Sequence, residues 1–245
     1  MDTRTALVCG GGSGIGFATA EALAADGYRV AITGRDRDSL TRAARNLTGA
    51  PVVPIVADIS DPGSAALVMG EVGHKLDVLV LNAGGPPPAR VLAAGDDQWH
   101  AALELLLLGP LRLARLALPT MAERGFGRVV VVTSNAVRQP QEELAISTVL
   151  RAAVTSAAKL LSREYADCGV TVNCVAPGAT DTARRREVLR ARGDADGLAD
   201  NAAIPLGRPA RPREIGDVIA FLASERASFI NGTVVTADGG RTETP

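Results

Sequence analysis

The 245-residue sequence predicts a single α/β domain, residues 1–245, built on a doubly wound parallel sheet of about seven strands with helices on both faces. Short runs rich in valine and isoleucine alternate with longer stretches rich in alanine, leucine and arginine. The short runs are continuously apolar, as buried parallel strands are. Strands that alternate with helices imply right-handed crossovers between parallel strands. No repeat, linker or low-complexity break interrupts this pattern.

The first half of the chain shows three strand–helix units and a further strand. It opens with TALVCG, passes through a glycine-rich loop into a helix, and starts the next unit at RVAITG. The predicted strands are 5–10, 29–34, 51–58 and 76–84. The predicted helices between them are 14–26, 36–47 and 61–74.

The second half has longer helices and one polar insertion. GRVVVVTS, VTVNCVAP and TVVTADGG are the predicted strands, at 127–134, 170–177 and 233–240. The predicted helices are 96–124, 141–167 and 212–224. Residues 179–203 are the most polar and least strand-like part, and we interpret them as a helical insertion or a mobile lid over the substrate. Its arginines either meet an anionic substrate or form a solvated helical face; they are Arg184, Arg185, Arg186, Arg190 and Arg192.

The charge and the composition argue against several classes of partner. With 26 Lys plus Arg and 27 Asp plus Glu, the net charge of −1 gives no electrostatic reason to expect nucleic acid or an anionic membrane. No apolar run reaches the roughly 18–20 residues of a membrane span, and no signal-peptide pattern is present, so we expect a cytoplasmic protein. Three cysteines without ligand spacing and two histidines, His74 and His100, predict no metal site.

The segment GGGSGIG, residues 10–16, carries the clearest functional signal. Glycines let the backbone turn tightly and approach a pyrophosphate, and the N-terminus of the following helix offers free N–H groups. A tight turn is the simpler explanation of such a loop. Its place between the first strand and a helix nevertheless predicts a Rossmann-type dinucleotide site. The candidate cofactor-binding residues in it are Gly10, Gly12, Ser13, Gly14, Ile15 and Gly16.

The end of the second strand predicts NADP(H) rather than NAD(H). A carboxylate at this place would bind the ribose 2′-hydroxyl of NAD and repel a 2′-phosphate. The sequence has Gly34 and then Arg35, whose planar guanidinium pairs well with phosphate. The alternative is a solvated arginine neutralised by Asp36 and Asp38.

These residues resemble the short-chain dehydrogenase/reductase family over nearly the whole chain, and the 3-oxoacyl-carrier-protein reductases in particular. GGGSGIG is similar to the family's TGxxxGIG, Asn82-Ala83-Gly84 to its NAG motif, 173–178 to its NxVxPG motif and 204–240 to its C-terminal signature. The resemblance implies further cofactor contacts from Asp58, Ile59, Asn82, Ala83, Gly84, Arg151, Pro177, Gly178 and Thr182.

The family's Asn–Ser–Tyr–Lys catalytic set is only partly retained. The matching positions hold Leu106, Ser134, Ser147 and Arg151, of which Ser134, Ser147 and Arg151 are the candidate catalytic residues. A serine hydroxyl is shorter than a tyrosine phenol and has a higher pKa, and a guanidinium does not give up its proton in proteins. Arg151 keeps the positive charge and could still bind ribose hydroxyls. A water could then supply the proton, or Glu142 or Glu143 if burial raised its pKa. A solvated carboxylate pair at the start of a helix is the simpler explanation of these two glutamates.

Three hypotheses about function follow. The leading one is an NADP(H)-dependent oxidoreductase that reduces a carbonyl or oxidises an alcohol of a small molecule with a non-standard proton donor. The second is a catalytically silent nucleotide-binding or partner subunit. The third is a non-redox enzyme that retains the cofactor fold. The family resemblance also implies a homo-oligomer, a dimer or tetramer, formed through helices 96–124 and 141–167 and the last strand.

Overall fold

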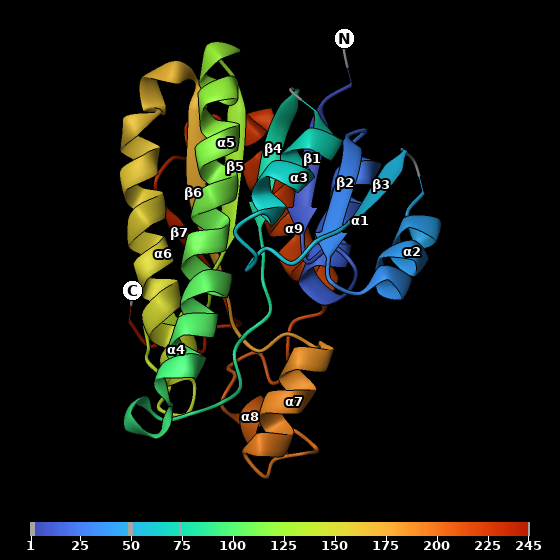
Figure 1. Ribbon diagram of the computed structural model, residues 1–245. Coiled ribbons are helices and arrows are strands. Elements are labelled where there is room, and N and C mark those ends of the chain that lie inside the picture. Colours follow the sequence, from blue (N-terminus) through green and yellow to red (C-terminus); the bar gives the residue numbers. More distant parts are fainter. Residues whose placement is uncertain (1–2, 49–50, 74, 245) are drawn as a thin grey trace.

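The computed structural model describes residues 3–48, 51–73 and 75–244, and it shows one parallel seven-stranded sheet. The strand order is β3-β2-β1-β4-β5-β6-β7, with the order reversing beside β1 (Figure 1). This confirms the predicted doubly wound Rossmann-type sheet. The strands are β1 (Thr5–Cys9), β2 (Arg29–Gly34), β3 (Val52–Val56), β4 (Leu76–Leu81), β5 (Gly127–Val132), β6 (Val170–Pro177) and β7 (Val234–Ala237).

Helices cover both faces of the sheet and enclose two apolar cores (Figure 1). One core lies under α1 (Gly14–Ala25), α2 (Arg37–Asn46) and α9 (Pro212–Ala223). The other lies under α3 (Ser64–Val72), α5 (Gly109–Glu123) and α6 (Ala145–Glu164). The central strands β1, β4, β5 and β6 are buried on both sides, which explains why they are continuously apolar in the sequence.

Several strands end earlier than predicted, and these ends build the site. β4 stops at Leu81 rather than at residue 84, and β5 stops at Val132 rather than at residue 134. The side chain of Asn82 then donates to the carbonyl of Cys9, 3.1 Å away, instead of continuing a ladder. β1, β3 and β7 are also shorter than their predicted ranges 5–10, 51–58 and 233–240, whereas β2 and β6 match theirs.

The prediction of one uninterrupted α-helix over 96–124 is wrong in its middle. The structure has α4 (Asp96–Leu103), a π-helical turn (Glu104–Leu108) and α5. Pro110 has no backbone N–H to donate to the preceding turn. At Gly109 a Cβ would lie 2.1 Å from the carbonyl oxygen of Ile59, so the helix passes very close to the loop after β3.

Helix α6 begins at Ala145, later than the predicted start at residue 141. The preceding residues pair with the segment after β4: Ala89 N–H donates to the Glu143 carbonyl at 2.8 Å, and Ala145 N–H donates to the Ala89 carbonyl at 3.2 Å. α3 is shorter than the predicted 61–74, of which residue 74 lies outside the described residues. The other predicted helices agree within one or two residues.

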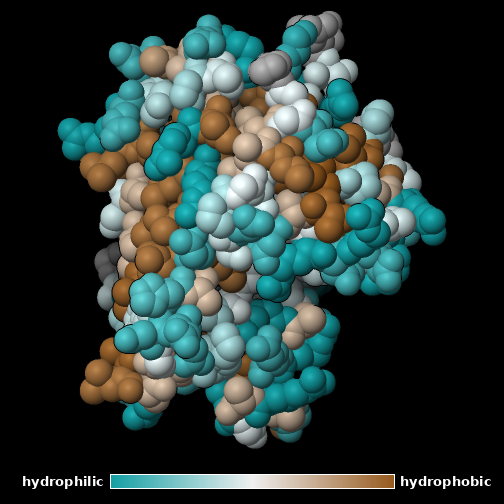
Figure 2. All heavy atoms as spheres, in the orientation of Figure 1, coloured by the Kyte–Doolittle hydropathy of each residue, from teal (hydrophilic) through white to brown (hydrophobic). Residues whose placement is uncertain are grey.

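The polar stretch 179–203 is helical, as predicted. It holds α7 (Ala183–Ala191) and α8 (Leu198–Ala202), which lie together beyond the carboxyl ends of the strands (Figure 1). Hydrophilic side chains cover this part of the surface (Figure 2). No helix in the described ranges has the length and apolar character needed to cross a membrane.

Asn173 in β6 should be important for stability. It is fully buried, its amide donates to the Ile230 carbonyl at 2.8 Å, and its oxygen accepts from Thr233 N–H at 3.2 Å. Asn173→Ala leaves both backbone groups unpaired, which should lower the free energy of unfolding by about 2–4 kcal/mol in a urea titration. Asn46→Ala, at an exposed position, is the control and should change it by less than about 0.5 kcal/mol.

Candidate functional site

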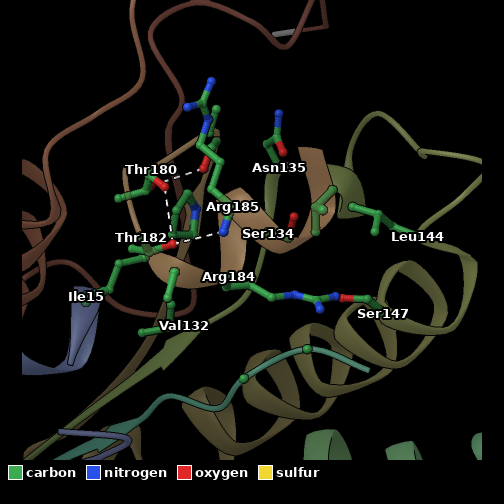
Figure 3. A pocket seen from close by; sticks show the side chains of 18 of the residues that line it. Ile15, Val132, Ser134, Asn135, Leu144, Ser147, Thr180, Thr182, Arg184 and Arg185 are labelled. Carbon is green, nitrogen blue, oxygen red and sulfur yellow. Dashed lines mark hydrogen bonds between the residues drawn. The ribbon is translucent and has the colours of Figure 1, made fainter. Parts of the chain in front are cut away.

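Two adjoining cavities open at the carboxyl ends of the strands, where ligands bind in doubly wound sheets. One, of about 800 Å³, lies between the glycine-rich loop, the end of β2 and the end of β3. The other, of about 580 Å³, lies between that loop, the ends of β5 and β6, α6 and α7 (Figure 3). Both are lined by Gly10, Ser13, Asn82, Ala83, Gly84 and Gly85.

All but one of the predicted cofactor-binding residues line these cavities. The first holds Gly12, Arg35, Asp58 and Ile59, and the second holds Gly14, Ile15, Arg151, Pro177, Gly178 and Thr182. Gly16 lines neither. A Cβ there would lie 2.1 Å from the carbonyl oxygen of Gly10, so this glycine allows the helix to pack under the loop.

The glycine-rich loop has the geometry of a phosphate cradle. Gly10 and Gly14 have φ of 63° and 54°, in the left-handed region that glycine adopts without strain. Helix α1 starts after Ser13, whose side chain does not cap it, so the first N–H groups remain available. A pyrophosphate fits here, because the backbone is bare and the helix N-terminus carries a partial positive charge.

Arg35 lies at the mouth of the first cavity. Its side chain is 75% exposed, and Nη1 lies 3.9 Å from a carboxylate oxygen of Asp58. Asp36 is engaged elsewhere, since it caps α2 by accepting from Ser39 N–H at 2.6 Å. Burial raises the pKa of Asp58, but hydrogen bonds from Ser60 and the charge of Arg35 outweigh it, so the pKa falls below its ordinary value.

Ser134 follows β5 and faces the second cavity (Figure 3). Its Oγ accepts from the backbone N–H of Ala136 at 3.2 Å, which fixes the side chain. No described residue accepts from its hydroxyl, so the O–H can donate into the cavity. The neighbouring Thr133 is buried and donates to the Val175 carbonyl at 3.1 Å.

Arg151 lies one helical turn after Ser147 and is held by four hydrogen bonds. Nε donates to Ser147 Oγ at 3.2 Å, and Nη1 donates to the Val132 carbonyl at 2.7 Å. Nη2 donates to the carbonyls of Ala83 and Gly84 at 3.1 and 3.3 Å. Four of its five N–H groups are therefore used. The geometry leaves little of this guanidinium for the ribose hydroxyls that the sequence suggested as its ligands.

The Arg151 guanidinium is buried without a carboxylate partner. Burial, and then the nearby charge of Arg184, lower its pKa to about 10. The group remains charged at neutral pH. Among the described residues, its hydrogen-bond partners are three carbonyls and one hydroxyl, none of which carries a negative charge.

The carboxylates proposed as proton donors are not directed into the second cavity. Glu142 is exposed and pairs with Arg90 at 2.7 Å, and Glu143 pairs with Nε of Arg192 at 2.6 Å. Leu106 is buried against Ile146 and Leu150 and does not line either cavity. His100 is exposed on α4.

The α7–α8 segment is fixed by a buried carboxylate that the sequence analysis did not single out. Asp200 accepts from Nε and Nη2 of Arg185, at 3.1 and 2.9 Å, and from Arg241 at 2.6 Å. Arg192 lies 3.7 Å from it. Burial raises the pKa of Asp200, but the bonds and charges of Arg241 and Arg185 outweigh it and lower the pKa. Asp200 is one of five acidic residues in 179–203, so the sequence does not distinguish it from the other four.

Cysteine and metal chemistry find no support in the geometry. Cys9 and Cys174 are buried, and burial raises the pKa of each thiol to about 12, so both remain protonated. Both lie in the apolar core under α3, α5 and α6. In the described part of the chain, no group of three histidine, cysteine or acidic side chains could hold a metal ion.

Comparison with known proteins identifies the relatives of this chain. Residues 10–242 match the family described as enoyl-(acyl carrier protein) reductase. The chain is 37% identical over 246 residues to cis-4-hydroxycyclohexanecarboxylate dehydrogenase of Sinomonas cyclohexanicum, covering 98% of this chain and 96% of that protein. It is 31% identical over 243 residues to a 3-oxoacyl-(acyl-carrier-protein) reductase of Escherichia coli K12, covering 98% of each. The solved structure of YwfH, an NADPH-dependent reductase involved in bacilysin biosynthesis, matches with a TM-score of 0.95 at 27% identity, over 100% of both chains.

Removing the charge of Asp200 should loosen the α7–α8 segment. In Asp200→Asn, trypsin should cleave within 183–192 several-fold faster than in the wild type, whereas Asp181→Asn, at an exposed ion pair, should leave the cleavage rate unchanged. Because the pKa is lowered in the folded state, the stabilisation is complete above the ordinary aspartate pKa of about 3.9 and is lost as the pH falls through the lower folded-state value. Equal cleavage of both variants would contradict the role of Asp200.

Proposed function

This chain belongs to the short-chain dehydrogenase/reductase family, and from that premise we propose that it is an NADP(H)-dependent oxidoreductase that interconverts a carbonyl and an alcohol of a small molecule. The observation that carries the proposal is that the two cavities adjoin each other and share the lining residues Gly10, Ser13 and 82–85. A dinucleotide whose pyrophosphate lies on the glycine-rich loop would extend from Arg35, in the first cavity, toward Ser134, in the second. Its nicotinamide supplies or accepts the hydride.

The preference for NADP(H) over NAD(H) is supported by the end of β2. Gly34 leaves room above Leu40. The exposed guanidinium of Arg35 can form a paired contact with a 2′-phosphate, since its one ion pair with a described residue is a long one. The NADPH dependence of YwfH agrees with this assignment.

Ser134 is the residue that we assign to the reacting oxygen. Its fixed hydroxyl can donate to a carbonyl oxygen and stabilise the negative charge that grows there during hydride transfer. Ser147 Oγ accepts from Arg151, which leaves its own O–H free to hold a water. Arg151 holds the ends of β4 and β5 against α6 and adds a positive charge that favours the developing alkoxide.

Water is the proton source that fits this arrangement best. Arg151 does not release a proton, and Glu142 and Glu143 are engaged in ion pairs outside the second cavity. Without a tuned phenol, proton transfer should limit the rate, by a factor that is typically about 10²–10⁴ for general acid–base catalysis.

A nucleotide-binding subunit without turnover is the second candidate. It is favoured by the same Arg151 geometry, because four of its N–H groups are already bonded. Tight NADPH binding together with no turnover of any carbonyl or alcohol would select this function. Substrate conversion without a change in nicotinamide absorbance would instead indicate a non-redox enzyme.

The assembly and the organisation of the chain are part of the proposal. We place the whole chain, 1–245, in a single cytoplasmic domain in which 179–203 covers the substrate. Apolar side chains gather on the outer surface of α5 and α6 (Figure 2), where Leu116, Val149 and Leu160 are exposed. They support a dimer or tetramer through these helices.

Cofactor binding is tested by titrating the protein with NADPH and NADH and following nicotinamide fluorescence. Wild type should prefer NADPH, and Arg35→Asp should weaken NADPH about ten- to one-hundredfold while NADH binding is kept or improved. Arg42→Asp, the same charge change at an exposed position on α2, is the control. No binding of either nucleotide to the wild type would refute the proposed function.

The role of Ser134 is tested with the first carbonyl compound that the protein reduces. Ser134→Ala should lower kcat about 10²–10³-fold, as loss of an oxyanion donor does, and should leave NADPH affinity unchanged. Ser156→Ala, on the exposed side of α6, should have wild-type kcat. A wild-type kcat in Ser134→Ala would show that another residue binds the reacting oxygen.

A further inference from the structure

Six arginines and two aspartates line the second cavity, so positive charge is in excess among its lining residues. Arg185, Arg192 and Arg241 face Asp200, and Arg186 pairs with Asp181 at 2.9 Å. Arg151 is buried and bonded only to neutral groups. Buried charges in proteins are normally paired, because removing a charge from water is expensive. The missing partner of Arg151 is therefore a feature to be explained.

Arg184 brings a second guanidinium to the same place. It projects from α7 across the cavity toward Ser147 (Figure 3) and donates to the Pro86 carbonyl. The contact is close because residue 85 is glycine: a Cβ there would lie 2.9 Å from Arg184 Nη2. Arg184 and Arg151 line the same cavity, and the positive charge of Arg184 contributes to the lowered pKa of Arg151. The chain thus brings two like charges together, which is unfavourable unless an anion joins them.

We propose that Arg184 and Arg151 form a subsite for a carboxylate group of the substrate. Glu187 pairs with Nη1 of Arg184 at 2.9 Å, so the three side chains carry a net charge of one. A single carboxylate neutralises it, whereas a phosphate would bring more than one negative charge. Arg184 uses two of its N–H groups for Pro86 and Glu187, and three remain for a carboxylate. Arg151 contributes mainly its charge.

This subsite narrows the substrate of the proposed oxidoreductase to an oxo acid or hydroxy acid. Ser134 and Arg184 line the same cavity, so the reacting oxygen and the carboxylate belong to one small molecule. Because α7 carries Arg184, the substrate would also tie the α7–α8 segment to the loop after β4. The inference rests on the proposed function for the reaction, but the anion site itself does not depend on it.

The test compares acids with their uncharged isosteres. Binding of pyruvate and pyruvamide, and of 4-oxopentanoate and 4-oxopentanamide, is measured by calorimetry at low ionic strength, with and without NADP⁺, which does not reduce them. In at least one pair the wild type should bind the acid about ten- to one-hundredfold more tightly than the amide. A charge-assisted hydrogen bond to the carboxylate contributes a difference of about this size. In Arg184→Gln this ratio should fall close to one, and Arg184→Lys should retain part of it.

Controls separate this subsite from the cofactor site and from general electrostatics. Arg190→Gln removes the same charge from the exposed side of α7 and should leave the ratio unchanged, as should Arg35→Asp in the absence of NADP⁺. An equal affinity of acid and amide for the wild type in every pair would overturn the proposal. An unchanged ratio in Arg184→Gln would also overturn it. An equal loss of acid and amide binding in this variant would overturn it too, because it would indicate that Arg184 acts only through its structural contact with Pro86. A retained subsite with no NADPH binding would instead refute the oxidoreductase function alone.

Discussion

The Arg151 guanidinium is the contact on which the architecture of the site depends. It joins the carboxyl ends of β4 and β5 to α6 through three carbonyl groups and one hydroxyl. Carbonyls at the ends of parallel strands have no ladder partner, and a planar group with five donors can satisfy several of them together. The same contact places a permanent positive charge beside the two serines. In this protein one side chain therefore both closes the end of the sheet and sets the electrostatics of the cavity.

The sheet and the nucleotide cradle could be predicted because each is encoded in short stretches. Strands buried on both sides need continuous apolar runs, so their positions follow from local sequence. The cradle needs glycine wherever the backbone passes another chain segment closely, as it does at Gly10 and Gly16. Strand ends were less accurate. The predicted strands ran on into the polar residues Asn82 and Thr133, whereas the strands of the structure end at Leu81 and Val132.

Contacts between distant residues were beyond prediction from one sequence. Whether the arginines of 184–192 face solvent or the cavity depends on which side of α7 packs against the protein, and that is decided by Asp200 and Pro86. The structure divides these arginines between both possibilities: Arg190 is exposed, whereas the partly buried Arg185 pairs with Asp200. The π-helical turn ends at Gly109, where the helix closely approaches the loop after β3.

The bond between Arg151 and Ser147 has a consequence for how this sequence can evolve. A tyrosine at 147 would have to displace the guanidinium that Ser147 now accepts from, and a lysine at 151 has no planar group to hold three carbonyls and a hydroxyl at once. Each change alone therefore disturbs the end of the sheet before any new chemistry can appear. We therefore expect a change at either position to be tolerated only together with a compensating change at the other.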